Sequence, residues 1–434
     1  MTAVVCRSNV GELPRAARDL IPVLLYGTTD RVHHSYIGNG VEEALRHFEV
    51  PTTVLAFDLL SIALAVTASD TFVSREDAPD RWCRSIQLDV ALFDPGPWRR
   101  VASKLEQALR FLSGDYWTLS FSEGGAPPPT PLTRVTVKTI ELPSSTDCVS
   151  LFSGGMDSTI GLLDLRADGR HPLLVSHAYN RDGGLQLDIL RRLSSAVPRL
   201  AVNLAPGKLR RTAPEITMRA RSFNFLALAV VAATMVKQAT QREGIDIIIP
   251  ENGFIALNPP LTPRRVGSLS TRTTHPYFLA ILQDVLNDVG ESVTLRNPYE
   301  YMTKGEMLRG CRDQTALAAV ASKTMSCSNW KRKGIACGRC VPCLIRRASF
   351  SAACMHDASE YQSPALNWSA EAMKLDDLLA VTTAIHRSSD APLRRLASKS
   401  GPLPLETATR QRYDDVIQRG LRELADYLGP LGLL

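Results

Sequence analysis

Residues 148–166 read CVSLFSGGMDSTIGLLDLR, and this stretch decides the fold class of the chain. The apolar run Val149–Phe152 is typical of a buried parallel strand, and Thr159–Leu165 has helical spacing. Between them lies a Ser-Gly-Gly-Met-Asp-Ser loop whose two glycines leave backbone N–H groups open to an anion, because no Cβ blocks the approach. The following helix directs the positive end of its dipole at the same point. The stretch therefore predicts a strand, a phosphate-binding loop and a helix.

The loop is not a Walker A motif, because no Gly-Lys-Ser/Thr follows at the required spacing. An ordinary serine- and glycine-rich turn is the alternative, but the order of strand, SGGxDS and helix favours a nucleotide site. The stretch resembles the PP-loop of the N-type ATP pyrophosphatases, which cleave ATP between its α- and β-phosphates. Members adenylate a substrate carboxylate or carbonyl oxygen, and a nucleophile then displaces AMP. The resemblance implies that the departing pyrophosphate, with Mg²⁺, is held by Ser153, Gly154, Gly155, Asp157 and Ser158.

Composition favours a soluble globular protein of two or three domains, with 434 residues, 44% hydrophobic and 22% charged. The N-terminus has no signal-peptide layout, and the apolar run Phe225–Val236 is too short to span a bilayer, so we expect a cytoplasmic location. The net charge is +6. Without a basic stripe interleaved with aromatic residues, solvated charge is favoured over a nucleic-acid surface, which stays possible. The basic clusters are Lys208/Arg210/Arg211, Arg264/Arg265 and Lys331-Arg332-Lys333.

The chain divides into four segments. Residues 1–123 are predicted to form an N-terminal α+β accessory domain, and the Gly/Pro-rich residues 124–131 are predicted to be a linker. In residues 132–350, strands and helices alternate, which predicts a doubly wound parallel α/β sheet. Residues 351–434 are predicted to be a helical C-terminal extension. In the accessory domain we predict strands at Ala3–Arg7, Pro22–Tyr26, Thr53–Phe57, Ile86–Phe93 and Tyr116–Phe121, and a helix at Trp98–Leu112.

The second sheet is predicted to place its functional loops at one edge. Ligands of such sheets sit beyond the carboxyl ends of the strands. We therefore expect residues 177–180 and 250–253 beside the SGGMDS loop. The further predicted elements are strands Pro172–His177, Arg199–Leu204 and Asp246–Pro250 and helices Gln186–Leu193 and Phe223–Lys237.

Four cysteines fall in one short basic segment, residues 327–343. Tetrahedral Zn²⁺, about 2.3 Å from each sulfur, satisfies four thiolates, and nearby Lys and Arg side chains offset their charge. An iron–sulfur cluster and a site without metal are the alternatives. No position is left open for water, so a structural zinc ion is predicted, with Cys327, Cys337, Cys340 and Cys343 as ligands.

The two motifs together resemble QueC, the 7-cyano-7-deazaguanine synthase family of queuosine biosynthesis, which has a PP-loop, HUP-like fold. The shared pattern is the loop, a C-terminal Cys-x₉-Cys-Gly-x-Cys-x₂-Cys and a following Arg. Thr303-Lys304-Gly305-Glu306 matches a Thr-Lys-x-Glu segment of that family, which implies that Lys304 contacts substrate or phosphate; an exposed lysine at a helix start is the alternative. Arg221 opens the apolar helix where PP-loop proteins carry an Arg, and a surface arginine is the alternative there.

The resemblance covers residues 147–350, and QueC proteins lack the flanking segments. Two-block chains of this kind resemble the QueC-like proteins of bacterial anti-phage systems, most closely QatC of the four-component Qat system. That resemblance implies adenylation of 7-carboxy-7-deazaguanine or a similar carboxylate and transfer to an amine, which the N-terminal domain suggests belongs to a partner protein of a defence operon. A queuosine-pathway synthase, a PP-loop tRNA-modifying enzyme and a non-catalytic nucleotide-binding scaffold are the alternatives.

Overall fold

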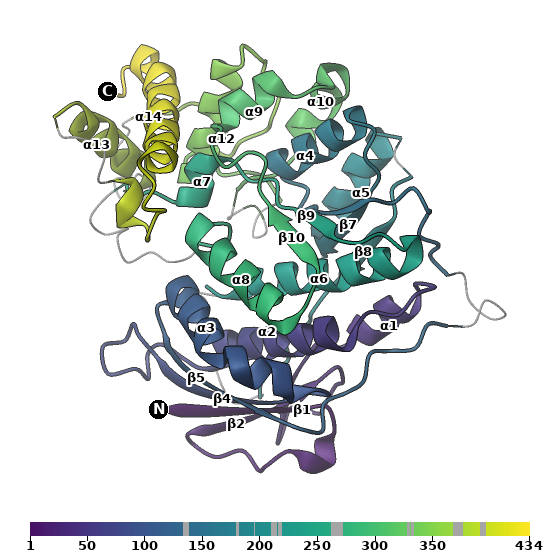
Figure 1. The fold of residues 1–434 in the computed structure, drawn as a ribbon. Coiled ribbons are helices and arrows are strands. Elements are labelled where there is room, and N and C mark those ends of the chain that lie inside the picture. Colours follow the sequence, from purple (N-terminus) through teal and green to yellow (C-terminus); the bar gives the residue numbers. More distant parts are fainter. Residues whose placement is uncertain are drawn as a thin grey trace.

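Two five-stranded parallel sheets organise the protein (Figure 1). The computed structural model describes residues 1–132, 139–178, 182–194, 196–209, 215, 219–261, 272–327, 330, 334–367, 376–390 and 396–434. The first sheet has the strand order β3-β2-β1-β4-β5, and the second has the order β10-β9-β6-β7-β8. All the strand pairs within them are parallel.

The N-terminal block is α/β rather than the predicted α+β, because its strands are parallel throughout. Alternate residues of β4 face the core, with Ile86, Leu88 and Val90 buried while Ser85 and Gln87 are exposed. One face of this sheet is therefore apolar and covered by helices. The strands are β1 (Thr2–Arg7), β2 (Leu20–Leu25), β3 (Ser35–Ile37), β4 (Ser85–Ala91) and β5 (Tyr116–Ser122), and the helices are α1 (Val41–Arg46), α2 (Val54–Phe72) and α3 (Pro95–Ser113).

The predicted strand Thr53–Phe57 is wrong, since these residues begin helix α2. Thr53 is the N-cap, and its hydroxyl accepts from the Ala56 N–H at 3.2 Å. From Ala56 to Phe72 every residue of the helix is buried. A helix buried all round has no amphipathic period, so its first apolar residues read like a strand.

The second block has the predicted doubly wound arrangement around the central strand β6. Its strands are β6 (Cys148–Leu151), β7 (Pro172–His177), β8 (Arg199–Val202), β9 (Ile245–Ile248) and β10 (Val293–Arg296). Its helices are α4 (Met156–Ala167), α5 (Asp182–Arg192), α6 (Arg221–Thr240), α7 (Gly253–Leu257), α8 (Pro276–Val289), α9 (Lys304–Gly310) and α10 (Gln314–Val320). The predicted strands and helices of this block are confirmed, with bounds that shift by a few residues.

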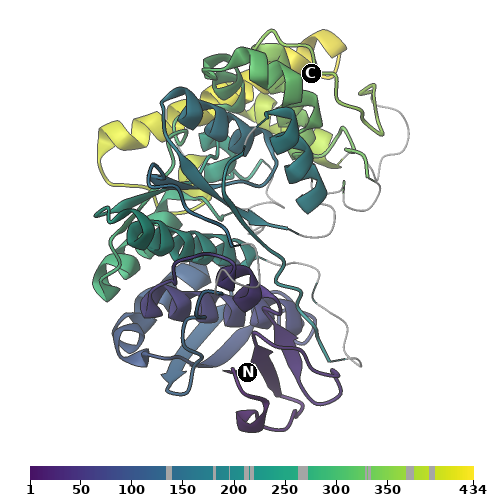
Figure 2. The same ribbon diagram turned by 90° about the vertical axis from the view of Figure 1, so that its right-hand side faces the viewer.

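A layer of helices lies between the two sheets and joins the blocks (Figures 1 and 2). Helices α2 and α3 of the first block pack against α6 and α8 of the second within one continuous apolar core. By length and composition α2 and α6 could each cross a membrane, but 89% and 72% of their apolar windows are buried inside the protein. Their packing identifies them as core helices. Residues 124–131 form no helix or strand, and the division of the chain there stays a prediction.

The C-terminal segment is helical and packs back on the second block. It contains α12 (Val341–Ala352), α13 (Asp376–Asp390) and α14 (Thr407–Leu428). Helix α14 lies against α7, α12 and α13 (Figure 1). Besides its contact with α7, its Glu423 side chain contacts Thr303, which precedes α9.

Candidate functional site

The SGGMDS loop turns from β6 into α4 with its backbone held open. Gly154 has a φ of +77°, and a Cβ there would lie 3.2 Å from Gln186 Cγ, so glycine is favoured on both counts. Its carbonyl accepts from the Met325 N–H at 3.2 Å. Gly155 is the N-cap of α4 and provides no side-chain cap, so the helix N-terminus is available to an anion.

The two serines of the loop hold each other. Their hydroxyl oxygens are 3.2 Å apart; Ser153 accepts from the Gly155 N–H at 3.3 Å, and Ser158 donates to the Gly155 carbonyl at 3.0 Å. Both serines line a cavity of about 520 Å³ at the carboxyl ends of β6, β7 and β9. The loop thus contributes two mutually hydrogen-bonded serine side chains to the cavity wall.

The rest of the cavity wall combines apolar side chains with polar and charged ones. Phe152, Phe225, Leu226 and Pro250 supply apolar surface, and His177 lines it 5.2 Å from the Phe225 ring. The aromatic and aliphatic side chains beside the loop suit contact with a planar ring. The prediction that loops meet at this edge is confirmed for His177 and Glu251, while Tyr179 and Asn180 lie outside the described residues.

Asp157 is buried behind the loop among three polar partners. Its carboxylate forms an ion pair with Lys304 and accepts from the Asn252 side-chain amide at 2.7 Å. Burial acts to raise the pKa of Asp157, but the Lys304 charge and hydrogen bonds from Glu251, Lys304 and Asn252 outweigh it and hold the pKa below its usual value. Burial and the neighbouring charge of Asp157 raise the pKa of Glu251 well above its usual value. Asp157 is therefore the more acidic of the two neighbouring carboxyl groups.

Lys304 is placed by a capping box at the start of α9. Thr303 is the N-cap, its hydroxyl accepts from the Glu306 N–H at 3.1 Å, and the Glu306 carboxylate accepts from the Thr303 N–H at 2.9 Å. Lys304 is the first helical residue and only 6% exposed, so the alternative of an exposed lysine is wrong. The position of Lys304 in the sequence does not indicate a partner for it; the fold places it beside Asp157.

Helix α14 reinforces this segment from the far end of the chain. The Glu423 carboxylate accepts from the Thr303 hydroxyl and from the Gly305 N–H, the latter at 3.3 Å. Arg419 forms an ion pair with Glu306 at 2.6 Å. The sequence carried no signal for these contacts, because α14 lies more than a hundred residues downstream.

The remaining predicted site residues are only partly placed. Arg221 begins α6, next to the cavity residue Ser222, but its side chain lies outside the described part of the structure. Of the predicted basic clusters, only Lys208 is described; Arg210, Arg211, Arg264, Arg265 and Lys331-Arg332-Lys333 lie outside the described residues. Asn252 and Glu251 were foreseen only as part of a strand end, and Arg219 in the cavity wall was not foreseen.

The four clustered cysteines lie together as a metal site requires. The sulfur atoms of Cys327, Cys337, Cys340 and Cys343 are all within 4.8 Å of one another, and the side chains are buried. Two of the separations, Cys337–Cys343 and Cys327–Cys340, are 3.9 Å. Tetrahedral zinc with bonds of about 2.3 Å places its sulfur ligands about 3.8 Å apart. The cluster therefore fits a single zinc ion whose four tetrahedral positions are all filled by thiolates.

Comparisons with known proteins agree with this arrangement. Residues 274–354 match the family described as "Queuosine biosynthesis protein QueC". The chain is 27% identical over 232 residues to a 7-cyano-7-deazaguanine synthase of Cupriavidus taiwanensis, covering 50% of this chain and 98% of the relative. The synthases of Cupriavidus necator and Myxococcus xanthus are 29% and 24% identical, again over 50% of this chain and 98% of each relative. Over half its length, this chain is therefore similar to the QueC family of 7-cyano-7-deazaguanine synthases.

Proposed function

We propose that this protein uses ATP to adenylate a carboxylate, 7-carboxy-7-deazaguanine or a close relative, and then transfers the acyl group to an amine. The observation that carries the proposal is the SGGMDS loop, whose two serines line a cavity and which leads into helix α4 without a side-chain cap. The printed names of the relatives supply the deazaguanine class of substrate. Release of pyrophosphate and AMP follows from this reaction.

Each part of the site has a role in the proposed reaction. The backbone N–H groups of the loop, with Ser153 and Ser158, bind the pyrophosphate as it departs. Lys304, reoriented from Asp157 or acting beside it, and Arg221 stabilise negative charge that develops at the α-phosphate. Mg²⁺ would neutralise phosphate charge, and ionised Asp157 is the carboxylate at the loop that fits its preference for oxygen ligands.

The amine acceptor belongs to the proposal as well. The relatives cover only half of this chain, and the N-terminal block adds a second α/β unit to the enzyme core. We propose that the acceptor is an amine of a partner protein, within an anti-phage system of the Qat type. Free ammonia is the second candidate, since the relatives are synthases of 7-cyano-7-deazaguanine, a nitrile.

The proposal is tested with purified protein, ATP and 7-carboxy-7-deazaguanine, with hydroxylamine added as the amine that displaces AMP from the acyl-adenylate. We expect AMP and pyrophosphate in equal amounts from the wild type, a loss of at least about a hundredfold in Asp157→Asn, and no loss in the control Asp188→Asn, whose partner is the surface residue Arg192. Equal traces from all three proteins contradict adenylation.

Four follow-up measurements separate the acceptors and the other classes. Formation of 7-cyano-7-deazaguanine when ammonium is added identifies a biosynthetic synthase, and a mass increase on a co-expressed protein identifies a protein acceptor. Salt-sensitive tRNA binding favours a tRNA-modifying enzyme. Binding of ATP without AMP release favours a scaffold.

A further inference from the structure

One wall of the cavity is formed by the N-terminal part of α6. Ser222, Phe225 and Leu226 of this helix line the cavity, and Thr273 and Thr274 line it from the segment before α8. The N-cap of α6 is Ala220, which provides no side-chain cap of its own. The first turn of this wall therefore depends on groups from elsewhere in the chain.

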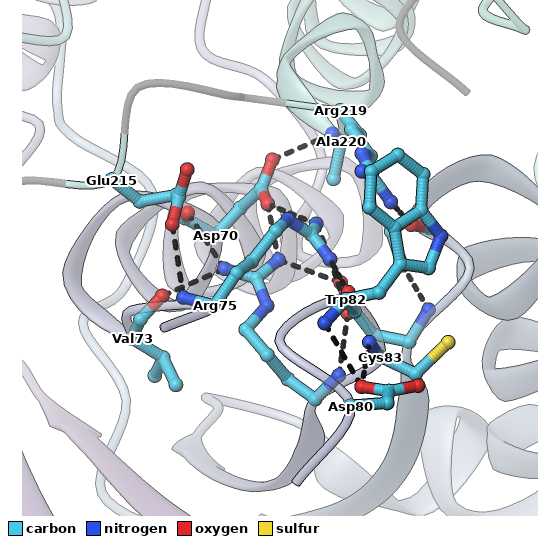
Figure 3. A network of polar contacts seen from close by, with 12 residues as sticks. Asp70, Val73, Arg75, Asp80, Trp82, Cys83, Glu215, Arg219 and Ala220 are labelled. Atoms are coloured by element: carbon cyan, nitrogen blue, oxygen red, sulfur yellow. Dashed lines mark hydrogen bonds and ion pairs between the residues drawn. The ribbon is translucent and has the colours of Figure 1, made fainter. Parts of the chain in front are cut away.

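The missing cap comes from the N-terminal block (Figure 3). The Asp70 carboxylate, on α2, accepts from the Ala220 N–H at 2.7 Å and is 1% exposed. Its other oxygen accepts from Arg84 at 2.5 Å and lies 3.5 Å from an Arg75 nitrogen. Both arginines also bind Asp115, Arg75 at 2.7 Å and Arg84 at 2.6 Å. Asp70 is thus held in one orientation by a buried network of alternating charges.

The residue before the cap is held by the same block. The Arg219 guanidinium lies 4.0 Å over the Trp82 ring and donates to the Ser113 carbonyl at 3.1 Å. Burial, with Arg75 next in effect, lowers the pKa of Arg219 to about 10. Figure 3 shows Asp70, Trp82 and Arg219 around the start of this helix.

The second cavity segment has a matching anchor on α3. Arg272 donates to the Phe111 carbonyl at 3.1 Å and lies 4.8 Å over the Phe111 ring. The His275 ring is 5.0 Å from the same ring. Thr273 and Thr274 are therefore bracketed by two residues that contact Phe111.

We propose that the N-terminal block is a structural part of the catalytic unit, in which Asp70 and Phe111 act as positioning residues for the substrate side of the cavity. The phosphate side depends on β6, α4 and α9, all within the second block. With the phosphates of ATP at the loop, we assign the wall formed by α6 and residues 273–274 to the second substrate, so the block affects recognition of that substrate more than binding of ATP. The kinetic part of this inference rests on the proposed function, whereas its structural part does not.

The test uses full-length Asp70→Asn and Phe111→Leu, with Asp89→Asn as the control. Asp89 is on β4 of the same sheet and pairs with Arg7 at 2.7 Å near the surface. We expect the KM for 7-carboxy-7-deazaguanine to rise about tenfold in both test variants, with the KM for ATP changed less than about threefold. The control should change neither. Equal rises in both KM values, or no rise in folded variants, overturn the inference.

Hydrogen exchange provides a readout that needs no substrate. In the same proteins, we expect amides of residues 220–226 and 272–275 to exchange at least about tenfold faster in the test variants, while those of residues 152–160 keep their rates. If Asp70→Asn does not fold, the exchange rates of Phe111→Leu alone test the inference. Unchanged exchange at the wall overturns the inference, even where the wild type shows no AMP release and the proposed function has failed.

Discussion

Replacing Lys304 with methionine tests the buried pair at the centre of the site. In the wild type the Asp157 carboxylate is nearly inaccessible and is balanced by the Lys304 ammonium. Removing one partner of a buried ion pair destabilises a protein by about 3–5 kcal/mol. Because Asn252 and Glu251 still donate to Asp157, we expect the lower end, a loss of about 3 kcal/mol in the free energy of unfolding. Urea denaturation measures this loss.

The double variant Lys304→Met/Asp157→Asn sharpens the prediction. It removes the uncompensated charge, so we expect it to recover about 2 kcal/mol relative to Lys304→Met alone. Its rate of AMP formation should nevertheless stay at least about a hundredfold below that of the wild type, because a group that stabilises phosphate charge is gone. If the double variant loses as much stability as Lys304→Met and Asp157→Asn lose together, the two residues do not form a buried pair. Full activity in Lys304→Met would refute the catalytic role.

Three further predictions follow from particular contacts. Glu423→Gln weakens the contacts of α14 with Thr303 and Gly305, so it should lower kcat about tenfold with little change in the KM for ATP. In the same steady-state assay, the control Asp426→Asn, exposed on the same helix, should change neither constant. Burial lowers the pKa of His275 to about 3. Between pH 7.5 and 5.0 this side chain is therefore protonated in the unfolded chain but not in the folded protein, so the free energy of unfolding falls as the pH falls. The wild type should lose about 2 kcal/mol more stability over that range than His275→Asn; equal losses in urea titrations exclude this assignment. Metal analysis should find about one zinc ion per chain and almost none in Cys340→Ser, and iron in place of zinc contradicts the site.

The SGGMDS loop and the cysteine cluster were predictable because their chemistry is local. A strand, a glycine turn and a helix N-terminus follow one another within a single stretch, and the thiols fall within one short segment. The pairing of Asp157 with Lys304 joins residues 147 positions apart, and only the resemblance to a family drew attention to that lysine. The contact of Glu423 with Thr303, across 120 positions, depends wholly on how the C-terminal helix packs.

The N-terminal block shows where local patterns mislead. Helix α2 is buried on all sides between a sheet and α6, so burial removed the polar face that normally marks a helix. The strand β3 has only three residues, which is too short to recognise in the sequence. The parallel strand order of this sheet was therefore not predicted. The capping of α6 by Asp70 crosses 150 positions and has no signature in either segment.

The most direct test of the account follows the oxygen of the substrate. The protein is incubated with ATP, hydroxylamine as the amine, and 7-carboxy-7-deazaguanine whose carboxylate carries a heavy oxygen isotope, and the mass of the AMP formed is measured. Adenylation of the carboxylate predicts that one labelled oxygen appears in AMP for every turnover, whichever amine accepts the acyl group. AMP without the label, or ADP in place of AMP, would contradict the proposed reaction.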